Sequence, residues 1–197
     1  MLLAIAGCGT DDGPTAATTA DFRWPDGPRP IAILQVEGMG EIRVELYPEL
    51  APATVDNFIE LANEDFYVGT TFHRILPDMM IQGGDPNSRD AEPANDGHGG
   101  TGHPIEDEFS EAPHIRGVIS MANSGGRNTG SSQFFIVRAD APHLDGKHSI
   151  FGRVVSGMEI VDAIAAVELD EHGRWGPPNR PLRNVVVSKI SIQATPE

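Results

Sequence analysis

The chain has 197 residues, a length that suits a single domain with one sizeable hydrophobic core. Its formal net charge of -15, from 29 acidic and 14 basic residues, argues against a nucleic-acid partner, because phosphate binding requires a basic surface. The single cysteine, Cys8, excludes an intrachain disulfide, and no apolar run approaches the ~20 residues that span a bilayer.

Residues 1–8 form a short apolar run that ends in small residues and a cysteine. The stretch Ile5-Ala6-Gly7-Cys8 resembles the lipobox of bacterial lipoprotein signals, in which the cysteine becomes the lipid-carrying N-terminus. We therefore expect residues 1–8 to be the remnant of such a signal and the protein to be extracytoplasmic, anchored to a membrane only through lipid on Cys8. Neither Lys nor Arg precedes Cys8 and the run is short, so an uncleaved N-terminus and a cytoplasmic protein stay open as the alternative.

Residues 9–30 are predicted to be a flexible tether. Residues 9–20 contain Gly, Thr, Asp, Ala and Pro, without an aromatic or large aliphatic side chain. Such a segment cannot bury enough apolar surface to offset the entropy of ordering. Residues 21–30 carry Trp24 and several prolines and lead into the folded domain, predicted at 31–193.

The domain begins with a predicted hairpin. Residues 31–36 are aliphatic and β-branched, and residues 41–47 alternate polar and apolar side chains, the period of a half-buried strand. Glycines at 38 and 40 supply the turn between them.

Two amphipathic segments are predicted to be helices. In residues 52–63, Val55, Phe58, Ile59 and Ala62 share one helical face, and Pro52 suits a first turn because its missing N–H would have no partner there. Residues 158–167 show a similar apolar face. The remaining strand candidates are short and separated by Gly, Asn and Pro: 70–75, 79–83, 117–122, 133–138, 150–155 and 185–192. Many short strands with two helices favour a mainly β, closed antiparallel barrel over an α/β sheet.

Five stretches carry a family resemblance. They are Phe72-His73-Arg74-Ile75-Leu76-Pro77, Met79-Met80-Ile81-Gln82-Gly83-Gly84-Asp85, Met121-Ala122-Asn123-Ser124, Ser132-Gln133-Phe134-Phe135-Ile136 and Leu144-Asp145-Gly146-Lys147-His148. They resemble the signature stretches of the cyclophilins, a family of peptidyl-prolyl cis-trans isomerases. The resemblance covers about residues 31–192 and implies a closed eight-stranded antiparallel barrel capped by two helices.

The implied reaction needs one well-placed cation. Rotation about a peptide C–N bond has a barrier of ~18–20 kcal/mol, although the cis and trans forms of X–Pro differ by only about 0.5–1 kcal/mol. A catalyst must stabilise the twisted amide, whose nitrogen regains a lone pair, and a fixed guanidinium can donate a hydrogen bond to it. The resemblance assigns this catalytic role to Arg74. A surface salt bridge is the alternative for an isolated arginine.

The resemblance also assigns substrate-binding roles. Apolar and aromatic side chains would form a slot for the proline ring: Met79, Met80, Phe135, Leu144 and His148. Gln82 would bind a substrate carbonyl, and the stretch Ala122, Asn123 and Ser124 would pair with the substrate main chain. Gln133 would support Arg74, and Gly97 would lie in a loop that forms a groove wall. No metal and no cofactor are implied.

Three positions depart from the commonest family pattern. Met79 replaces a phenylalanine, which should leave the slot apolar with a softer wall. Residues 124–130 hold one extra residue, which puts the outer groove rim in doubt. His143 stands where many members carry a tryptophan that binds cyclosporin, so we expect weak cyclosporin binding with isomerase activity kept; a solvated loop histidine is the alternative for this position.

Two functions stay open. The first is an isomerase that accelerates X–Pro exchange and the folding of exported proteins, favoured because Arg74 occurs together with Gln82, Phe135 and His148. The second is a non-catalytic proline-peptide binding module or holdase chaperone. Either would act as a monomer on proline-containing polypeptides and unfolded proteins. A glycine-rich run at 97–102 is not expected to bind a dinucleotide, since no helix pattern follows it.

Overall fold

The structure is a computed structural model that describes residues 22–194. The predicted signal remnant, Cys8 and most of the predicted tether lie outside the described residues. Within residues 22–194, no helix is long and apolar enough to cross a membrane.

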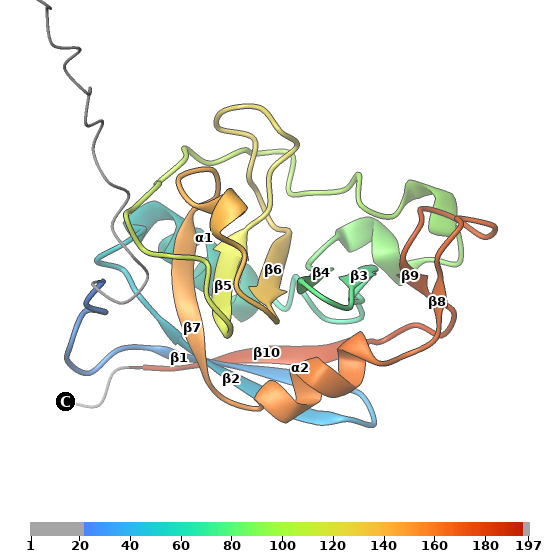
Figure 1. The fold of residues 1–197 in the computed structure, drawn as a ribbon, viewed down its shortest axis with the longest axis horizontal. Helices are drawn as coiled ribbons and strands as arrows, with labels where there is room; N and C mark the ends of the chain where they lie inside the picture. Colours follow the sequence, from blue (N-terminus) through green and yellow to red (C-terminus); the bar gives the residue numbers. More distant parts are fainter. Residues whose placement is uncertain (1–21, 195–197) are drawn as a thin grey trace, which may run out of the picture.

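Eight antiparallel strands form one curled sheet in the order β10-β1-β2-β7-β5-β6-β4-β3. The predicted hairpin is present as β1 (Ile31–Val36) and β2 (Gly40–Leu46). The other six strands are short: β3 (Arg74–Leu76), β4 (Met80–Gly83), β5 (Val118–Met121), β6 (Phe134–Val137), β7 (Ile150–Ser156) and β10 (Val187–Gln193). Figure 1 shows the sheet curling round, with α1 (Pro52–Asn63) and α2 (Met158–Ala165) at opposite ends of it.

The prediction of a closed barrel was wrong: the sheet is an open half-barrel, because its end strands β3 and β10 do not pair. Just before these strands, Thr71 and Val186 form a single isolated bridge. The main-chain N–H of Ile75, in β3, donates instead to the carbonyl of Asn179 at 2.9 Å. The free edge of β3 is therefore bonded to the residue that precedes β9 (Arg180–Pro181), which pairs with β8 (Leu169–Asp170) in a small hairpin that was not predicted.

Helix α1 has the predicted bounds and buries Val55, Phe58 and Ala62. The predicted Ile59 is only partly buried, and Leu61 is buried as well. After β4, the segment of residues 86–96 folds into two short 3-10 helices, η1 (Pro86–Arg89) and η2 (Pro93–Asn95), and buries Ser88 and Asp96.

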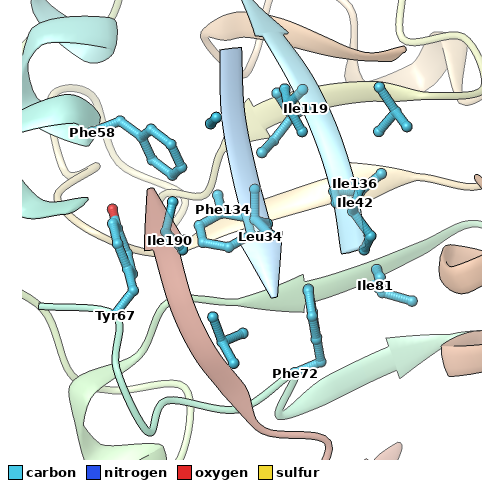
Figure 2. Packing of buried hydrophobic residues seen from close by; sticks show 14 of the residues in the cluster. Leu34, Ile42, Phe58, Tyr67, Phe72, Ile81, Ile119, Phe134, Ile136 and Ile190 are labelled. Atoms are coloured by element: carbon cyan, nitrogen blue, oxygen red, sulfur yellow. The ribbon is translucent and has the colours of Figure 1, made fainter. Parts of the chain in front are cut away.

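The two faces of the sheet carry two separate apolar clusters. The inner cluster fills the half-barrel and includes Phe58 of α1 with Ile81, Phe134 and Ile136 of the sheet, as Figure 2 shows. The outer cluster is built on alternate positions of the same strands: Met80, Val118, Phe135, Val137 and Ile150, with Ala112 and Ala141. Strand β6 is fully buried because Phe134 and Ile136 face one cluster while Phe135 and Val137 face the other.

Residues 22–30, predicted as the end of the tether, pack on the domain instead. Phe22 and Trp24 contact the outer cluster, and the Trp24 ring lies 5.3 Å from that of Tyr47. Arg29 is buried and donates to both carboxylate oxygens of Glu49, at 3.2 and 2.9 Å. Residues 9–20 contain neither aromatic residues nor arginine, whereas residues 22–30 use both to pack on the domain. The folded domain therefore begins before residue 31.

Candidate active site

Strand register places Arg74, Gln82 and Phe135 in one row across the sheet. Arg74 of β3 pairs with Gln82 of β4, which pairs with Phe135 of β6. Side chains of directly opposed residues point to the same face. Since Phe135 belongs to the outer cluster, the guanidinium and the amide lie on the outer face, beside an apolar surface.

The polar end of this row is a chain of side-chain hydrogen bonds. Arg74 Nη1 donates to Gln82 Oε1 at 3.1 Å, and Gln82 Nε2 donates to Gln133 Oε1 at 2.9 Å. Gln133 Nε2 then donates to the carbonyl of Gly99 at 2.9 Å. Each amide uses both its donor and its acceptor, so the orientation of Gln133 fixes that of Gln82, and Gln82 holds Arg74.

The Arg74 side chain is open to solvent and, within residues 22–194, makes no ion pair. Protein around the guanidinium lowers the pKa of Arg74 by desolvation. A guanidinium stays charged at neutral pH even so. The surface salt bridge that was the alternative role for this residue is absent from the described part of the chain.

The apolar end of the row forms a slot on the outer cluster. Phe135 and Met80 are buried, and Met79, Ala122 and Leu144 pack against the same cluster while staying partly open. His148 closes the slot from a loop: its ring lies edge-on to that of Phe135, at 5.1 Å and 89°.

His148 is held by the main chain of β5. Its Nδ1 lies 3.1 Å from the carbonyl of Met121. Burial lowers the pKa of His148, against the opposing effect of this carbonyl. A neutral imidazole that donates from Nδ1 suits this position, since the carbonyl can only accept.

A cavity of about 460 Å³ adjoins the polar end of the row. The predicted residues Gln82, Gly97, Asn123, Ser124 and Gln133 line it, together with Ala122. Gly97 has a φ of 86°, in the left-handed region, and its N–H donates to Asp85. The groove wall predicted at Gly97 therefore lies beside the amide chain.

The loop after β5 is tied to the loop that carries His148. Asn123 Nδ2 donates to the carbonyl of Lys147 at 2.9 Å, and the Ser124 N–H donates to Thr129 Oγ1 at 3.0 Å. Within residues 22–194 the main-chain N–H and C=O of Asn123 have no hydrogen-bond partner. They are thus free to pair with an extended peptide.

One predicted site residue is not brought into the slot. His143 lies on the 3-10 turn η3 (Pro142–Leu144), but its side chain is exposed and is not among those that pack on the outer cluster. Its carbonyl accepts from Lys147 Nζ at 2.8 Å.

Sequence reasoning missed three polar residues behind the slot: Ser120, His114 and Asp145. His114 is buried, and its ring is stacked on that of Phe135 at 6.0 Å and 17°. The three residues come from β5, from the chain before it and from the loop after η3, so no local pattern joins them; the Leu-Asp-Gly-Lys-His stretch was quoted, but Asp145 was given no role.

The arrangement suits the rotation of an amide better than its cleavage. It offers a charged donor, two amides and an apolar slot on a rigid sheet. Within residues 22–194 there is no cluster of three or more His, Cys, Asp or Glu side chains that could hold a metal ion. The fold and the site define the class of protein: an isomerase of the peptide bonds that precede proline, built on an antiparallel half-barrel.

Comparison with known proteins gives the family. The sequence model of "Cyclophilin type peptidyl-prolyl cis-trans isomerase/CLD" matches residues 31–192. The chain is 46% identical over 150 residues to the peptidyl-prolyl cis-trans isomerase ppi1 of Schizosaccharomyces pombe, which covers 74% of this chain and 90% of the yeast protein. It is 48% identical over 126 residues to peptidyl-prolyl cis-trans isomerase B of Bacillus subtilis, covering 63% of this chain and 82% of that one.

A solved structure is similar as well. A cyclophilin-type isomerase of Cryptosporidium parvum, crystallised in the presence of the dipeptide Ala-Pro, gives a TM-score of 0.73 at 29% identity, covering 83% of this chain and 99% of that one. The protein therefore belongs to the cyclophilin-type peptidyl-prolyl cis-trans isomerases. The predictions of the family, of the mainly β fold and of an isomerase are confirmed at this level.

Proposed function

We propose that the protein isomerises X–Pro bonds with Arg74 as the catalytic residue and the outer slot as the proline site. The observation that carries this assignment is the register row that joins Arg74, Gln82 and Phe135 on one face. It sets a fixed cation beside an apolar surface against which a pyrrolidine ring can pack.

In this mechanism the proline ring sits between Phe135, Met80 and Leu144, with His148 at its edge. Asn123 pairs with the peptide main chain through its free N–H and C=O, and Gln82 Nε2 or Arg74 binds a carbonyl. As the C–N bond twists, the nitrogen regains its lone pair and becomes an acceptor for the Arg74 guanidinium. This interaction is stronger in the twisted state than in the planar one, so it lowers the barrier.

The first test measures cis-to-trans exchange of an Ala-Pro-Phe peptide by NMR with wild type, Arg74→Ala and Arg74→Lys. We expect wild type to accelerate exchange and Arg74→Ala to lose about 10²–10³-fold in kcat/KM, by analogy with the removal of one oxyanion-hole donor. Arg74→Lys should recover little, because an ammonium lacks the planar fork.

Arg43→Ala is the matched control. Arg43 lies on β2, where it donates to Gln193 Oε1 at 2.7 Å, so the variant removes the same charge away from the site. It should keep wild-type activity. A folded wild type that binds the peptide without accelerating its exchange would leave the binding module as the function.

We also propose that the clients are exported polypeptides and that lipid on Cys8 anchors the protein outside the cytoplasm. Support comes from the lipobox-like stretch Ile5-Ala6-Gly7-Cys8 and from the composition of residues 9–20. The mass of the protein recovered from a bacterial membrane fraction, beside Cys8→Ser, tests this: a diacylglycerol adduct on wild type alone is expected. A cytoplasmic protein of unmodified mass would contradict it.

We propose as well that cyclosporin binds weakly. His143 is exposed and stands where many family members carry the tryptophan that binds this ligand.

A further inference from the structure

A second polar chain runs behind the slot and is not explained by the amide chain in front of it. His114 Nδ1 lies 2.8 Å from Asp145 Oδ1, and His114 Nε2 lies 3.0 Å from Ser120 Oγ. Asp145 Oδ1 also accepts the main-chain N–H of His114 at 2.8 Å. The main-chain N–H of His114 and both of its ring nitrogens therefore have hydrogen-bond partners.

The donors in this chain can be assigned. An ionised carboxylate only accepts, so Nδ1 carries the proton of the neutral ring, and Nε2 accepts from the Ser120 hydroxyl. Burial lowers the pKa of His114, although Asp145 opposes this; His148 and His143, the other titratable groups that face the ring, lower it further. The neutral ring is thus the form that the fold selects.

A nucleophilic role is excluded by burial. A serine, a histidine and an aspartate in this order can activate a hydroxyl for attack on a carbonyl. Here Ser120 has no exposed surface and His114 is 1% exposed, so no substrate carbonyl can reach the hydroxyl. The chain must act through the groups that it contacts.

Those groups are the two walls of the slot. Ser120 lies opposite Phe135 in the register of β5 and β6, and the His114 ring is stacked on Phe135. At the other end, Asp145 follows Leu144 and lies three residues before His148, on the loop that forms the facing wall. One buried imidazole therefore joins the sheet wall to the loop wall.

We propose that His114 is a positioning residue that holds the loop of residues 142–148 at a fixed distance from Phe135 and so sets the width of the proline slot. The role of the slot rests on the proposed function, whereas the attachment of the loop can be tested without it. The geometry predicts that loosening the loop weakens peptide binding and leaves the chemistry at Arg74 unchanged.

Asp145→Ala tests this, with Asp140→Ala as a closely matched control; alanine is used because an asparagine would keep an accepting oxygen. Asp140 Oδ1 accepts the main-chain N–H of Arg116 at 2.9 Å, the same kind of bond as that between Asp145 and the His114 N–H. In Asp145→Ala we expect KM for the Ala-Pro-Phe peptide to rise about tenfold, the loss typical of a hydrogen bond to a charged group, with kcat within about twofold. Amide exchange at Lys147, whose N–H donates to the Leu144 carbonyl at 3.1 Å, should accelerate. Asp140→Ala should change neither KM nor Lys147 exchange.

A second variant keeps the test decisive if the Asp145 variant does not fold. His114→Phe keeps a ring against Phe135 and removes both side-chain hydrogen bonds, and it should raise KM and loop exchange in the same way. A fall in melting temperature with KM and Lys147 exchange at wild-type values would overturn the proposal and leave His114 as a core residue. If wild type fails to accelerate isomerisation, the proposed function fails, while peptide affinity and Lys147 exchange still decide the role of His114.

Discussion

At the scale of single residues, Gln133 is the side chain on which the front of the site depends most. It is 9% exposed, and its amide accepts from Gln82 and donates to the Gly99 carbonyl. In Gln133→Leu, Gln82 Nε2 and the Gly99 carbonyl lose their partners together. Gln82 can then turn, and Arg74 loses a fixed orientation. We expect kcat/KM for the Ala-Pro-Phe peptide to fall about 10–100-fold, since a partly buried amide pair is broken next to the catalytic group.

The control for Gln133→Leu is Gln35→Leu, the same chemical change on β1, where the glutamine is partly exposed and makes no side-chain hydrogen bond within residues 22–194. Its activity should equal that of wild type. If Gln133→Leu keeps full kcat/KM, the hydrogen bonds between Gln82 and Gln133 are not needed to orient the Arg74 guanidinium.

The residues in front of the slot could be predicted from the sequence, and those behind it could not. Arg74 and Gln82 stand in two adjoining quoted stretches, so the resemblance carries them together. His114 and Asp145 are 31 positions apart, and a lone histidine beside a proline gives no local signal of a role. Their contact depends on how β5, β6 and the loop after η3 pack, which is a tertiary property.

At the scale of elements, helix α1 is capped by a residue from another part of the chain. Its N-cap, Ala51, offers no side-chain hydrogen bond. Glu108 instead accepts the N–H groups of Ala53 and Thr54, at 3.0 and 2.8 Å, and the Thr54 hydroxyl at 2.7 Å. A carboxylate there binds free amide protons and meets the positive end of the helix dipole.

We predict that Glu108→Ala lowers the free energy of unfolding by about 1–2 kcal/mol, the typical cost of losing a cap, as measured by urea denaturation at pH 7. Glu106→Ala, a change at an exposed carboxylate two residues away, should stay within about 0.5 kcal/mol of wild type. Equal effects at the two positions would show that Glu108 contributes only surface charge.

The elements that the sequence predicted well are those with a strong period. The hairpin alternates over its full length, and α1 shows its apolar face and its Pro52 start, so their bounds agree with prediction within a residue. The predicted closure of the barrel, which requires β3 to pair with β10, was wrong because β3 has only three residues. Nothing in so short a run tells whether its free edge bonds to β10 or to Asn179.

At the scale of the whole molecule, two buried histidines couple stability to pH. His73 and His114 are 3% and 1% exposed. Desolvation lowers the pKa of His73, with Arg74 adding to this and Asp85 and Asp96 opposing it, and both ring nitrogens of His73 lack a hydrogen-bond partner within residues 22–194. Desolvation likewise lowers the pKa of His114 and that of the partly buried His148, which acts in the same sense.

Stability should therefore fall as the solution is acidified through pH 6.5. Below that pH the unfolded chain binds protons at both histidines, whereas the folded protein does not until its own lower pKa values are reached. Each histidine lowers the free energy of unfolding by at most about 1.4 kcal/mol per pH unit, the limit reached where the unfolded chain holds the proton and the folded protein does not. Repulsion among the 29 acidic residues acts in the opposite sense, but it relaxes mainly below about pH 5, where carboxylates begin to gain protons.

Urea denaturation at pH 7.5, 6.5, 6.0, 5.5 and 5.0 separates these contributions. We expect the free energy of unfolding to be nearly constant above pH 7 and to decline between pH 6.5 and 5.0. His114→Gln removes one of these groups and should make that slope shallower, whatever it does to stability at pH 7.5. His172→Gln, at an exposed position on the β8–β9 loop, should keep the wild-type slope. A stability that is flat or rising from pH 6.5 to 5.0 would mean that the buried imidazoles take up protons in the folded state as readily as in the unfolded chain.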